Sequence, residues 1–246
     1  MAKKSRKNRK EHNVVHPAFD HHDTDWHPLD EEINGRRDQK YVKNIKPRSD
    51  GQAELMKAID SYSLTLAIGP AGTGKTYLAI AKAAEALEKG QIERIILSRP
   101  AMEAGESLGY LPGDMQEKMA PYLRPLYDCL GDRMGGKKVR QYIEDGTIEI
   151  APIGFMRGRT LNNSFVVIDE AQNCTYGQLK MILSRLGWHS TMVVTGDPRQ
   201  SDLLEGMSGL DDISRRLDAL DNVAVCRLSN GDIVRHPLVA EMLDVL

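Results

Sequence analysis

Cysteine, aromatic residues and long apolar runs are scarce in this chain, and each shortage excludes a class of protein. The 246 residues include three widely spaced cysteines, which excludes a disulfide framework or zinc-site spacing and favours reduced thiols in the cytoplasm. No apolar stretch approaches the length that spans a bilayer, and no apolar segment of a secretory signal follows the basic start. We therefore expect a cytoplasmic protein without a membrane partner.

Aromatic residues make up 5% of the chain, so few side chains are available to stack on nucleobases. Residues 1–10 carry six Lys and Arg side chains and no acid, and the rest of the chain has a net charge of −8 because the whole sums to −2. A basic tail on an acidic body is typical of an electrostatic nucleic-acid contact, and equally of a solvated disordered start.

Two regions are predicted from the pattern of apolar residues. Residues 1–46 form a basic, His-rich extension without apolar periodicity, which we expect to be largely disordered. Five of the seven histidines lie there among aspartates, but nothing around them indicates a rigid metal site. Residues 47–246 form the folded domain.

The most informative motif is residues 69–76, which match the phosphate-binding pattern G-x-x-x-x-G-K-[ST]. An apolar strand is predicted before it at 64–68 and an Ala-rich helix after it at 77–87. In this context the backbone N–H groups and the helix N-terminus surround a phosphate chain, Lys75 reaches the β- and γ-phosphates, and the Thr76 hydroxyl ligates Mg²⁺. The residues predicted to contact the nucleotide here are Gly69, Pro70, Ala71, Gly72, Thr73, Gly74, Lys75, Thr76 and Tyr77.

Strand and helix patterns alternate along the remainder of the domain. Helices are predicted at 52–59 and 116–130, and further strands at 94–98, 147–152, 165–168, 191–194 and 223–226. This alternation predicts an α/β fold, a mostly parallel sheet with helices on both faces. In such sheets the chemistry lies beyond the carboxyl ends of the strands.

Two of the predicted strands end in residues suited to hydrolysis. The strand at 165–168 is followed by Asp169, which would hold Mg²⁺, and by Glu170, which would orient and polarise the attacking water. The strand at 191–194 leads to Gly196, Asp197 and Gln200, where the latter two would sense the γ-phosphate. Solvated acids and an ordinary Gly-Asp-Pro turn are the simpler interpretations of these two segments.

With these motifs in place, the chain resembles the PhoH-like ATPases, which are related to superfamily 1 helicases. The resemblance runs from about residue 47 to the C-terminus and includes GPAGTGKTYLAIAKA at 69–83, VVIDEAQN at 166–173, TGDPRQSDL at 195–203 and VRHPLV at 234–239. It implies a RecA-like P-loop NTPase fold, ATP and Mg²⁺ as cofactors, and hydrolysis coupled to single-stranded nucleic acid, with RNA favoured over DNA.

The resemblance also implies roles that spacing does not supply. Gln52 lies where related helicases read the adenine edge, and Ser98, Arg99, Arg157 and Arg159 lie where they contact the nucleic-acid backbone. Arg235 is the leading candidate for a catalytic arginine finger and Arg185 the second. Because monomeric helicases bind ATP between two such domains and this chain has room for one, we expect a homo-oligomeric ring, by analogy a hexamer.

Two other functions stay open from the sequence. A nucleotide-gated binding module that acts through partners would use the same fold and site. A small-molecule kinase is disfavoured because a glutamate poised on water is poorly suited to a reaction that must exclude water. The 46 residues before the domain are too few for a nuclease domain, so no nuclease activity is expected.

Overall fold

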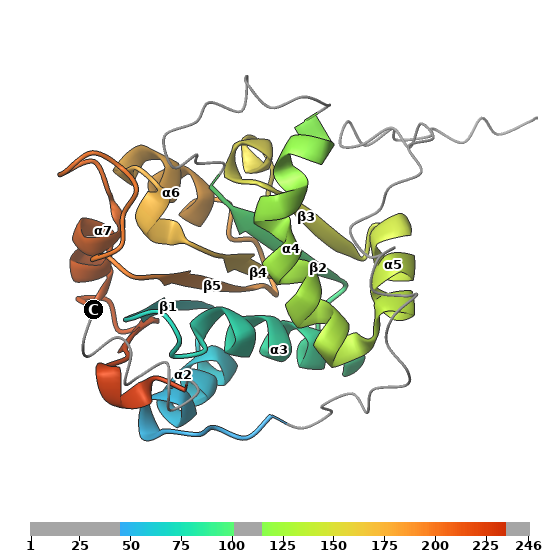
Figure 1. The fold of residues 1–246 in the computed structure, drawn as a ribbon, viewed down its shortest axis with the longest axis horizontal. Helices are drawn as coiled ribbons and strands as arrows, with labels where there is room; N and C mark the ends of the chain where they lie inside the picture. Colours follow the sequence, from blue (N-terminus) through green and yellow to red (C-terminus); the bar gives the residue numbers. More distant parts are fainter. Residues whose placement is uncertain (1–44, 101–114, 235–246) are drawn as a thin grey trace, which may run out of the picture.

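The computed structural model describes residues 45–100 and 115–234, which form a parallel sheet flanked by helices (Figure 1). The α/β class predicted from the sequence is confirmed. In chain order the elements are α2 (Asp50–Ser61), β1 (Leu64–Ile68), α3 (Lys75–Glu88), β2 (Arg94–Arg99), α4 (Met115–Met134), α5 (Gly136–Glu144), β3 (Ile148–Pro152), η2 (Ile153–Met156), β4 (Ser164–Ile168), η3 (Ala171–Asn173), α6 (Tyr176–Leu183), β5 (Thr191–Gly196), α7 (Leu210–Leu217), β6 (Val223–Arg227) and η4 (Asn230–Asp232).

The six strands lie in the order β3-β2-β4-β5-β1-β6, and every neighbouring pair is parallel. Strands β1 and β4 are buried at every residue, as expected for strands covered on both faces of a parallel sheet. Strand β5 lies between them, so the segments that follow β1, β4 and β5 leave the sheet side by side at its carboxyl edge. This order places the three predicted motifs next to one another.

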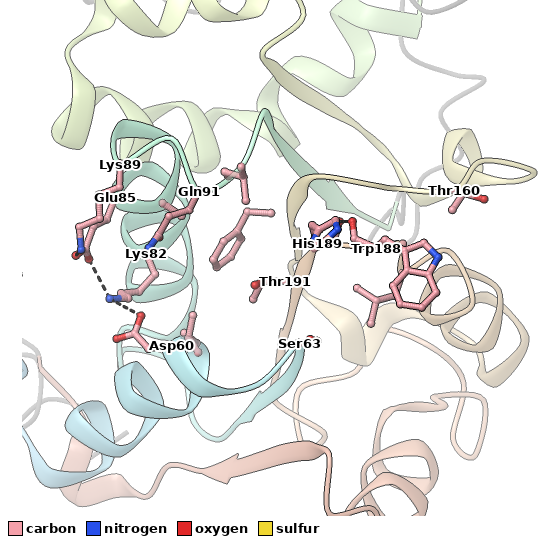
Figure 2. Close-up of a pocket in the computed structure, with 17 residues that line it drawn as sticks. Asp60, Ser63, Lys82, Glu85, Lys89, Gln91, Thr160, Trp188, His189 and Thr191 are labelled. Carbon is pink, nitrogen blue, oxygen red and sulfur yellow. Dashed lines mark hydrogen bonds and ion pairs between the residues drawn. The ribbon is translucent and has the colours of Figure 1, made fainter.

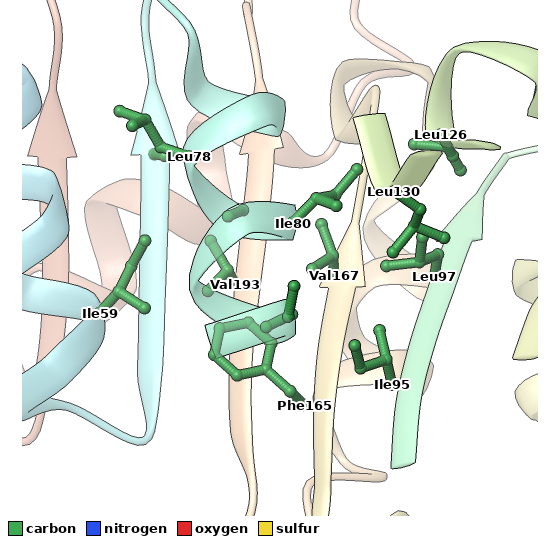
Figure 3. Close-up of a cluster of buried hydrophobic side chains, with 14 of the residues drawn as sticks. Ile59, Leu78, Ile80, Ile95, Leu97, Leu126, Leu130, Phe165, Val167 and Val193 are labelled. Carbon is green, nitrogen blue, oxygen red and sulfur yellow. The ribbon is translucent and has the colours of Figure 1, made fainter. Parts of the chain in front are cut away.

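Alternate residues of the strands pack into two cores on opposite faces of the sheet. On one face, α2, α3, α4 and α5 cover side chains such as Leu97, Val167 and Val193 (Figure 3). On the other face, η2, α6 and α7 cover side chains such as Leu66 and Val194. Figure 1 shows α2 and α3 on one side of β1 and β5, with α6 and α7 on the other. Helices therefore cover both faces, as predicted.

Local sequence explains where the helices around the site begin. Ser49 caps α2 by accepting a hydrogen bond from the Gln52 N–H. Thr175 and Gln178 form a capping box at the start of α6. The small side chains of Ala79, Ala81, Ala83 and Ala84 are almost fully buried and let α3 pack closely on the sheet.

The structure adds helices whose bounds the sequence pattern did not predict, namely α5, α6 and α7. Among the described residues, no helix combines the length and the apolar character needed to cross a membrane.

Candidate nucleotide site

The loop between β1 and α3 has the backbone conformation that its glycines permit. Gly69, Gly72 and Gly74 have φ angles of 150°, 81° and 81°, which other residues rarely adopt. A Cβ at Gly69 would lie 2.4 Å from the Leu228 carbonyl oxygen, so only glycine fits between the loop and the end of β6. Gly74 caps α3 without a side chain, which leaves the first N–H groups of the helix for an anion.

The Lys75 ammonium lies across this loop. Its Nζ donates to the carbonyl oxygens of Gly69 and Pro70 at 2.6 and 2.7 Å and approaches the Thr73 hydroxyl at 3.4 Å. Burial lowers the pKa of Lys75 below the usual lysine value, and the carboxylates of Asp197, Glu170 and Asp169 oppose this effect. The lysine charge is therefore surrounded by the acids that the sequence predicted to act beside it.

The Asp169 carboxylate joins three elements at the carboxyl edge of the sheet. It accepts hydrogen bonds from the Thr76 hydroxyl at 2.5 Å and from the Thr195 hydroxyl at 2.8 Å. Asp169 is 5% exposed. Hydroxyl and carboxylate oxygens are the ligands that Mg²⁺ prefers, so the residues predicted to hold this cation do lie together.

Glu170 has a left-handed backbone, with φ of 52°, which is uncommon for a residue with a side chain and typical of functional sites. One carboxylate oxygen lies 3.3 Å from an Arg99 guanidinium nitrogen. The other oxygen accepts a short hydrogen bond from the Gln172 side-chain amide. Two neighbours from different elements thus hold the predicted catalytic carboxylate.

The segment 195–203, called here the sensor loop, contacts both motifs. The Gly69 N–H donates to the Gly196 carbonyl oxygen at 3.2 Å, which joins the phosphate loop to the end of β5. The buried Asp197 carboxylate accepts from the Arg199 N–H at 3.1 Å. Gln200, the other predicted sensor, is exposed at the turn of the loop. Asp197 therefore lies inside the site and the Gln200 side chain at its surface.

Gln52 supports the phosphate loop from α2. Its side-chain amide donates to the Thr73 carbonyl oxygen at 3.0 Å and accepts from the Arg48 N–H at 2.9 Å, and the residue is 5% exposed. Contact with an adenine edge through this amide would require one of these bonds to be exchanged. The other loop residues line the surface above it: Pro70, Ala71 and Tyr77 are half-buried and Gly72 is exposed.

The end of the described chain also touches the phosphate loop. The Val234 N–H donates to the Gly72 carbonyl oxygen at 2.9 Å. Asp232 accepts from the Ser229 N–H at 2.8 Å and from the Gly51 N–H at 3.2 Å, and these bonds lower its pKa, the bond from Ser229 most of all. The predicted finger Arg235 lies outside the described residues.

The predicted nucleic-acid residues differ in their surroundings. Ser98 is fully buried, and its hydroxyl has no hydrogen-bond partner among the described residues, so the structure gives no support to a contact between this side chain and a strand. Arg159 makes two bonds to the Glu149 carboxylate, at 2.5 and 2.7 Å. Arg157 is exposed and forms no ion pair within the described part of the chain. Of the two arginines, Arg157 is thus the available one.

Arg185, the second finger candidate, is held by its own subunit. Its guanidinium donates to the Met181 and Arg159 carbonyl oxygens, each at 3.3 Å, and to the Ser184 hydroxyl at 3.1 Å. Arg185 lies just after α6, at the end of that helix far from the candidate site.

Two residues of the site were not assigned a role from the sequence. Thr195 shares Asp169 with Thr76, and the signal for it was its position as the last residue before Gly196 at a strand end. Gln172 contacts Glu170 and the sensor loop, and the signal for it was its place two residues after Glu170. Thr195 and Gln172 bond to residues of neighbouring segments, so their roles follow from the order of the strands, which the sequence pattern does not fix.

A cavity of about 1060 Å³ opens at the opposite, amino edge of the sheet (Figure 2). Its lining includes Lys82, which pairs with Asp60 at 2.7 Å, and the 81% exposed Trp188. No residue of the phosphate loop or of the acid pair lines it. The candidate nucleotide site is therefore the open carboxyl edge and not this cavity.

Comparisons with known proteins show which family the chain matches. A family model described as PhoH-like protein matches residues 44–246. A PhoH-like protein of Bacillus subtilis (strain 168) is 52% identical over 203 residues, which cover 82% of this chain and 64% of that protein. Protein PhoH of Escherichia coli (strain K12) is 45% identical over 216 residues, which cover 87% of this chain and 61% of that protein. The chain thus spans less than two thirds of the length of these relatives.

Among solved structures, the large terminase of a thermophilic bacteriophage is similar, with a TM-score of 0.51 and 11% identity over 81% of this chain and 50% of that chain. At this identity the likeness concerns the fold, which is that of the α/β P-loop NTPases.

Proposed function

The chain belongs to the PhoH-like protein family, and on that premise we propose that it hydrolyses ATP and couples hydrolysis to the binding or remodelling of single-stranded nucleic acid, RNA rather than DNA. The observation that supports this best is the convergence of Lys75, Thr76, Asp169 and Glu170 at the carboxyl edge of one sheet. Phosphoryl transfer asks the protein mainly for positioning and charge neutralisation, which these residues supply.

The residues present fit ATP with Mg²⁺. The loop offers backbone N–H groups to the phosphates, and the Lys75 ammonium would exchange the Gly69 and Pro70 carbonyl oxygens for phosphate oxygens. Thr76 and Asp169 would hold Mg²⁺, which when bound neutralises charge on the phosphates. Within the described ranges no group of three His, Cys, Asp or Glu side chains converges on a metal position, which suits an ion that takes its other ligands from phosphates and water.

Glu170 distinguishes hydrolysis from transfer to an acceptor. A carboxylate beside Asp169 and Lys75 can orient a water and accept its proton as the bond to the γ-phosphorus forms. A kinase site would need to keep that water away. The arrangement therefore supports hydrolysis.

The ion pair between Arg99 and Glu170 supports coupling to nucleic acid. Arg99 is predicted to contact a phosphate backbone, and its guanidinium lies 3.3 Å from the catalytic carboxylate. A strand that drew Arg99 toward its own phosphates would change the surroundings of Glu170. Bound nucleic acid would in this way alter the hydrolysis rate.

A nucleotide-gated binding module is the second candidate. Both carboxylate oxygens of Glu170 are engaged by protein side chains, an arrangement that favours slow turnover without a partner. A wild-type chain that binds ATP tightly, hydrolyses it slowly and gains no rate from nucleic acid would support this second function.

The test compares the wild type with Glu170→Gln, with Glu205→Gln as a control because Glu205 is an exposed acid of the same chain. Glu170→Gln is expected to bind ATP and to lose hydrolysis, whereas the control retains both and Lys75→Ala loses ATP binding. Loss of ATP binding by Glu170→Gln would give the glutamate a structural role. A wild-type ATPase rate that does not respond to RNA or DNA at low salt would refute the coupling.

We further propose a ring of identical subunits, a hexamer by analogy, in which a neighbouring subunit supplies the arginine finger. Mass photometry with ATP and Mg²⁺ tests it, and monomers alone would contradict it.

A further inference from the structure

The Gln172 side chain joins two parts of the candidate site. Its Nε2 donates to the Glu170 carboxylate, and its Oε1 accepts from the Asp197 N–H at 3.1 Å. These two partners fix which end of the amide is which, because a carboxylate needs a donor and an N–H needs an acceptor. Gln172 is 3% exposed, so both ends of the amide are satisfied inside the protein.

The sensor loop packs closely around this residue. A Cβ at Gly196 would lie 2.8 Å from the Gln172 Oε1, so the glycine makes the approach possible. The Ser201 hydroxyl donates to the Gln172 carbonyl oxygen at 3.0 Å. Gln172 is thus held by backbone and side-chain atoms on both sides of the loop.

We propose that Gln172 is a positioning residue that couples the orientation of the Glu170 carboxylate to the conformation of the sensor loop, and through it to the phosphates of a bound nucleoside triphosphate. The inference rests on the proposed function, because it requires Glu170 to act on water. A loop that moves toward a γ-phosphate carries the Asp197 N–H with it. The Gln172 amide then follows, and the carboxylate bonded to its other end turns.

The chemistry of an amide suits this task. It donates to a carboxylate in a charge-assisted hydrogen bond, and it adds no charge to a site that already contains three acids around Lys75. It also transmits displacement from one end to the other, since donor and acceptor share one planar group.

Two substitutions separate the two ends of the side chain. Gln172→Met has a similar length and neither polar end, so it loses both bonds. Gln172→Glu keeps an acceptor for the Asp197 N–H and loses the donor to Glu170. Both are expected to lower kcat for ATP roughly 10- to 100-fold, the scale of a lost hydrogen bond to a charged group. The ATP Kd is expected within roughly twofold of wild type in Gln172→Met, whereas Gln172→Glu adds an acid to the site and weakens ATP binding further.

Hydrogen–deuterium exchange measures directly whether the hydrogen bond between the Asp197 N–H and the side chain at position 172 is retained. The Asp197 amide is expected to exchange faster in Gln172→Met than in the wild type and to stay protected in Gln172→Glu. A residue that only filled space would change kcat and KM together with the folded fraction. It would not produce opposite exchange in the two variants.

Asn173 provides a control next in the chain, because its side-chain amide donates to the Asp202 carboxylate at 2.7 Å and only its backbone N–H, which a substitution retains, bonds to the Glu170 carbonyl oxygen. Asn173→Ala is expected to lower kcat less than Gln172→Met does, because it loosens the loop only at Asp202 and leaves the Gln172 amide bonded to Glu170. If the wild type is active and Gln172→Met keeps the wild-type kcat, the role of Gln172 is refuted while the proposed function stands. A wild type that binds ATP and does not hydrolyse it would overturn the proposed function and this role with it.

Discussion

The same substitution, threonine to valine, is expected to have opposite effects on stability at two buried positions of neighbouring strands. Thr65 in β1 and Thr195 in β5 are both fully buried. Ala67 and Val193 belong to the core under α2 and α3. Thr65 lies two residues before Ala67 and Thr195 two residues after Val193, so both threonine side chains point to that face of the sheet. The Thr65 hydroxyl has no hydrogen-bond partner among the described residues, whereas the Thr195 hydroxyl donates to Asp169 at 2.8 Å.

Valine replaces each hydroxyl by a methyl group of nearly the same size. In Thr65→Val an unpartnered polar group leaves the core, and we expect the free energy of unfolding to rise by about 1 kcal/mol. In Thr195→Val the buried Asp169 carboxylate loses one of its donors, and we expect a fall of about 2 kcal/mol.

Urea unfolding followed by circular dichroism measures both changes, and for a domain of this size about 1 kcal/mol shifts Tm by roughly 2–4 °C. The double variant is expected to be additive, because the two hydroxyls share no bond. A Thr65→Val variant that is less stable than the wild type would refute the reasoning, as would two changes of the same sign.

Three further predictions follow from the same contacts. Gly69→Ala is expected to abolish ATP binding in a nucleotide-binding assay, because its Cβ would lie 2.4 Å from the Leu228 carbonyl oxygen at a φ of 150°; tight binding would contradict the backbone geometry. Arg157→Gln is expected to weaken RNA binding and lower its salt dependence without changing Tm, whereas Arg159→Gln lowers Tm because Glu149 loses its partner; the reverse pattern would exchange their roles. Burial raises the pKa of all three thiols, to about 12, 12 and 11 for Cys129, Cys174 and Cys226. At pH 8 a thiol reagent is therefore expected to react slowly with the native chain and rapidly in urea, and rapid labelling of the native chain would refute this. Because the thiols ionise more easily in the unfolded chain, the free energy of unfolding is expected to fall as the pH rises from about 8.5 toward these values.

Strand positions could be predicted closely because the parallel strands are continuous apolar runs between polar residues. β1 begins and ends where its run does, at Leu64 and Ile68. The order of the strands could not be predicted, because strands that are apolar on both faces carry no alternation to fix their neighbours.

The helices without predicted bounds have eight or nine residues, so their apolar periodicity extends over little more than two turns. Local polar pairs add to this signal in two of them. α6 has eight residues and begins with the Thr175 and Gln178 capping box, which is readable as T-x-x-Q. α7 also has eight residues and is lined by ion pairs four residues apart, such as Asp212 with Arg216 at 3.0 Å. Both patterns were present in the sequence and indicate helices.

The residues of the contiguous motifs were predicted from the sequence, including Thr76 and Asp169, which are 93 positions apart and were assigned to one Mg²⁺ from their motifs. Hydrogen bonds between these motifs and other residues were not predicted. The phosphate loop and the Asp169-Glu170 pair are contiguous motifs. The bond between Gln52 and the Thr73 carbonyl joins residues 21 positions apart, and that between Asp169 and Thr195 joins residues 26 positions apart. Ser98 lies one residue before the strand end, where alternation turns its side chain into the protein.

The strand order itself explains why the sensor loop contacts both the phosphate loop and the acid pair. Along the chain the phosphate loop comes first, the acid pair second and the sensor loop last, but in space β5 lies between β1 and β4. The end of β5 therefore contacts the phosphate loop through the Gly69 N–H and the acid pair through Gln172 and Thr195. The sensor loop is bonded to Glu170 through the Asp197 N–H and the Gln172 amide, beside the direct bond between Thr76 of the phosphate loop and Asp169. The glycine at 196 follows from that position, because a side chain there would push Gln172 away from the loop.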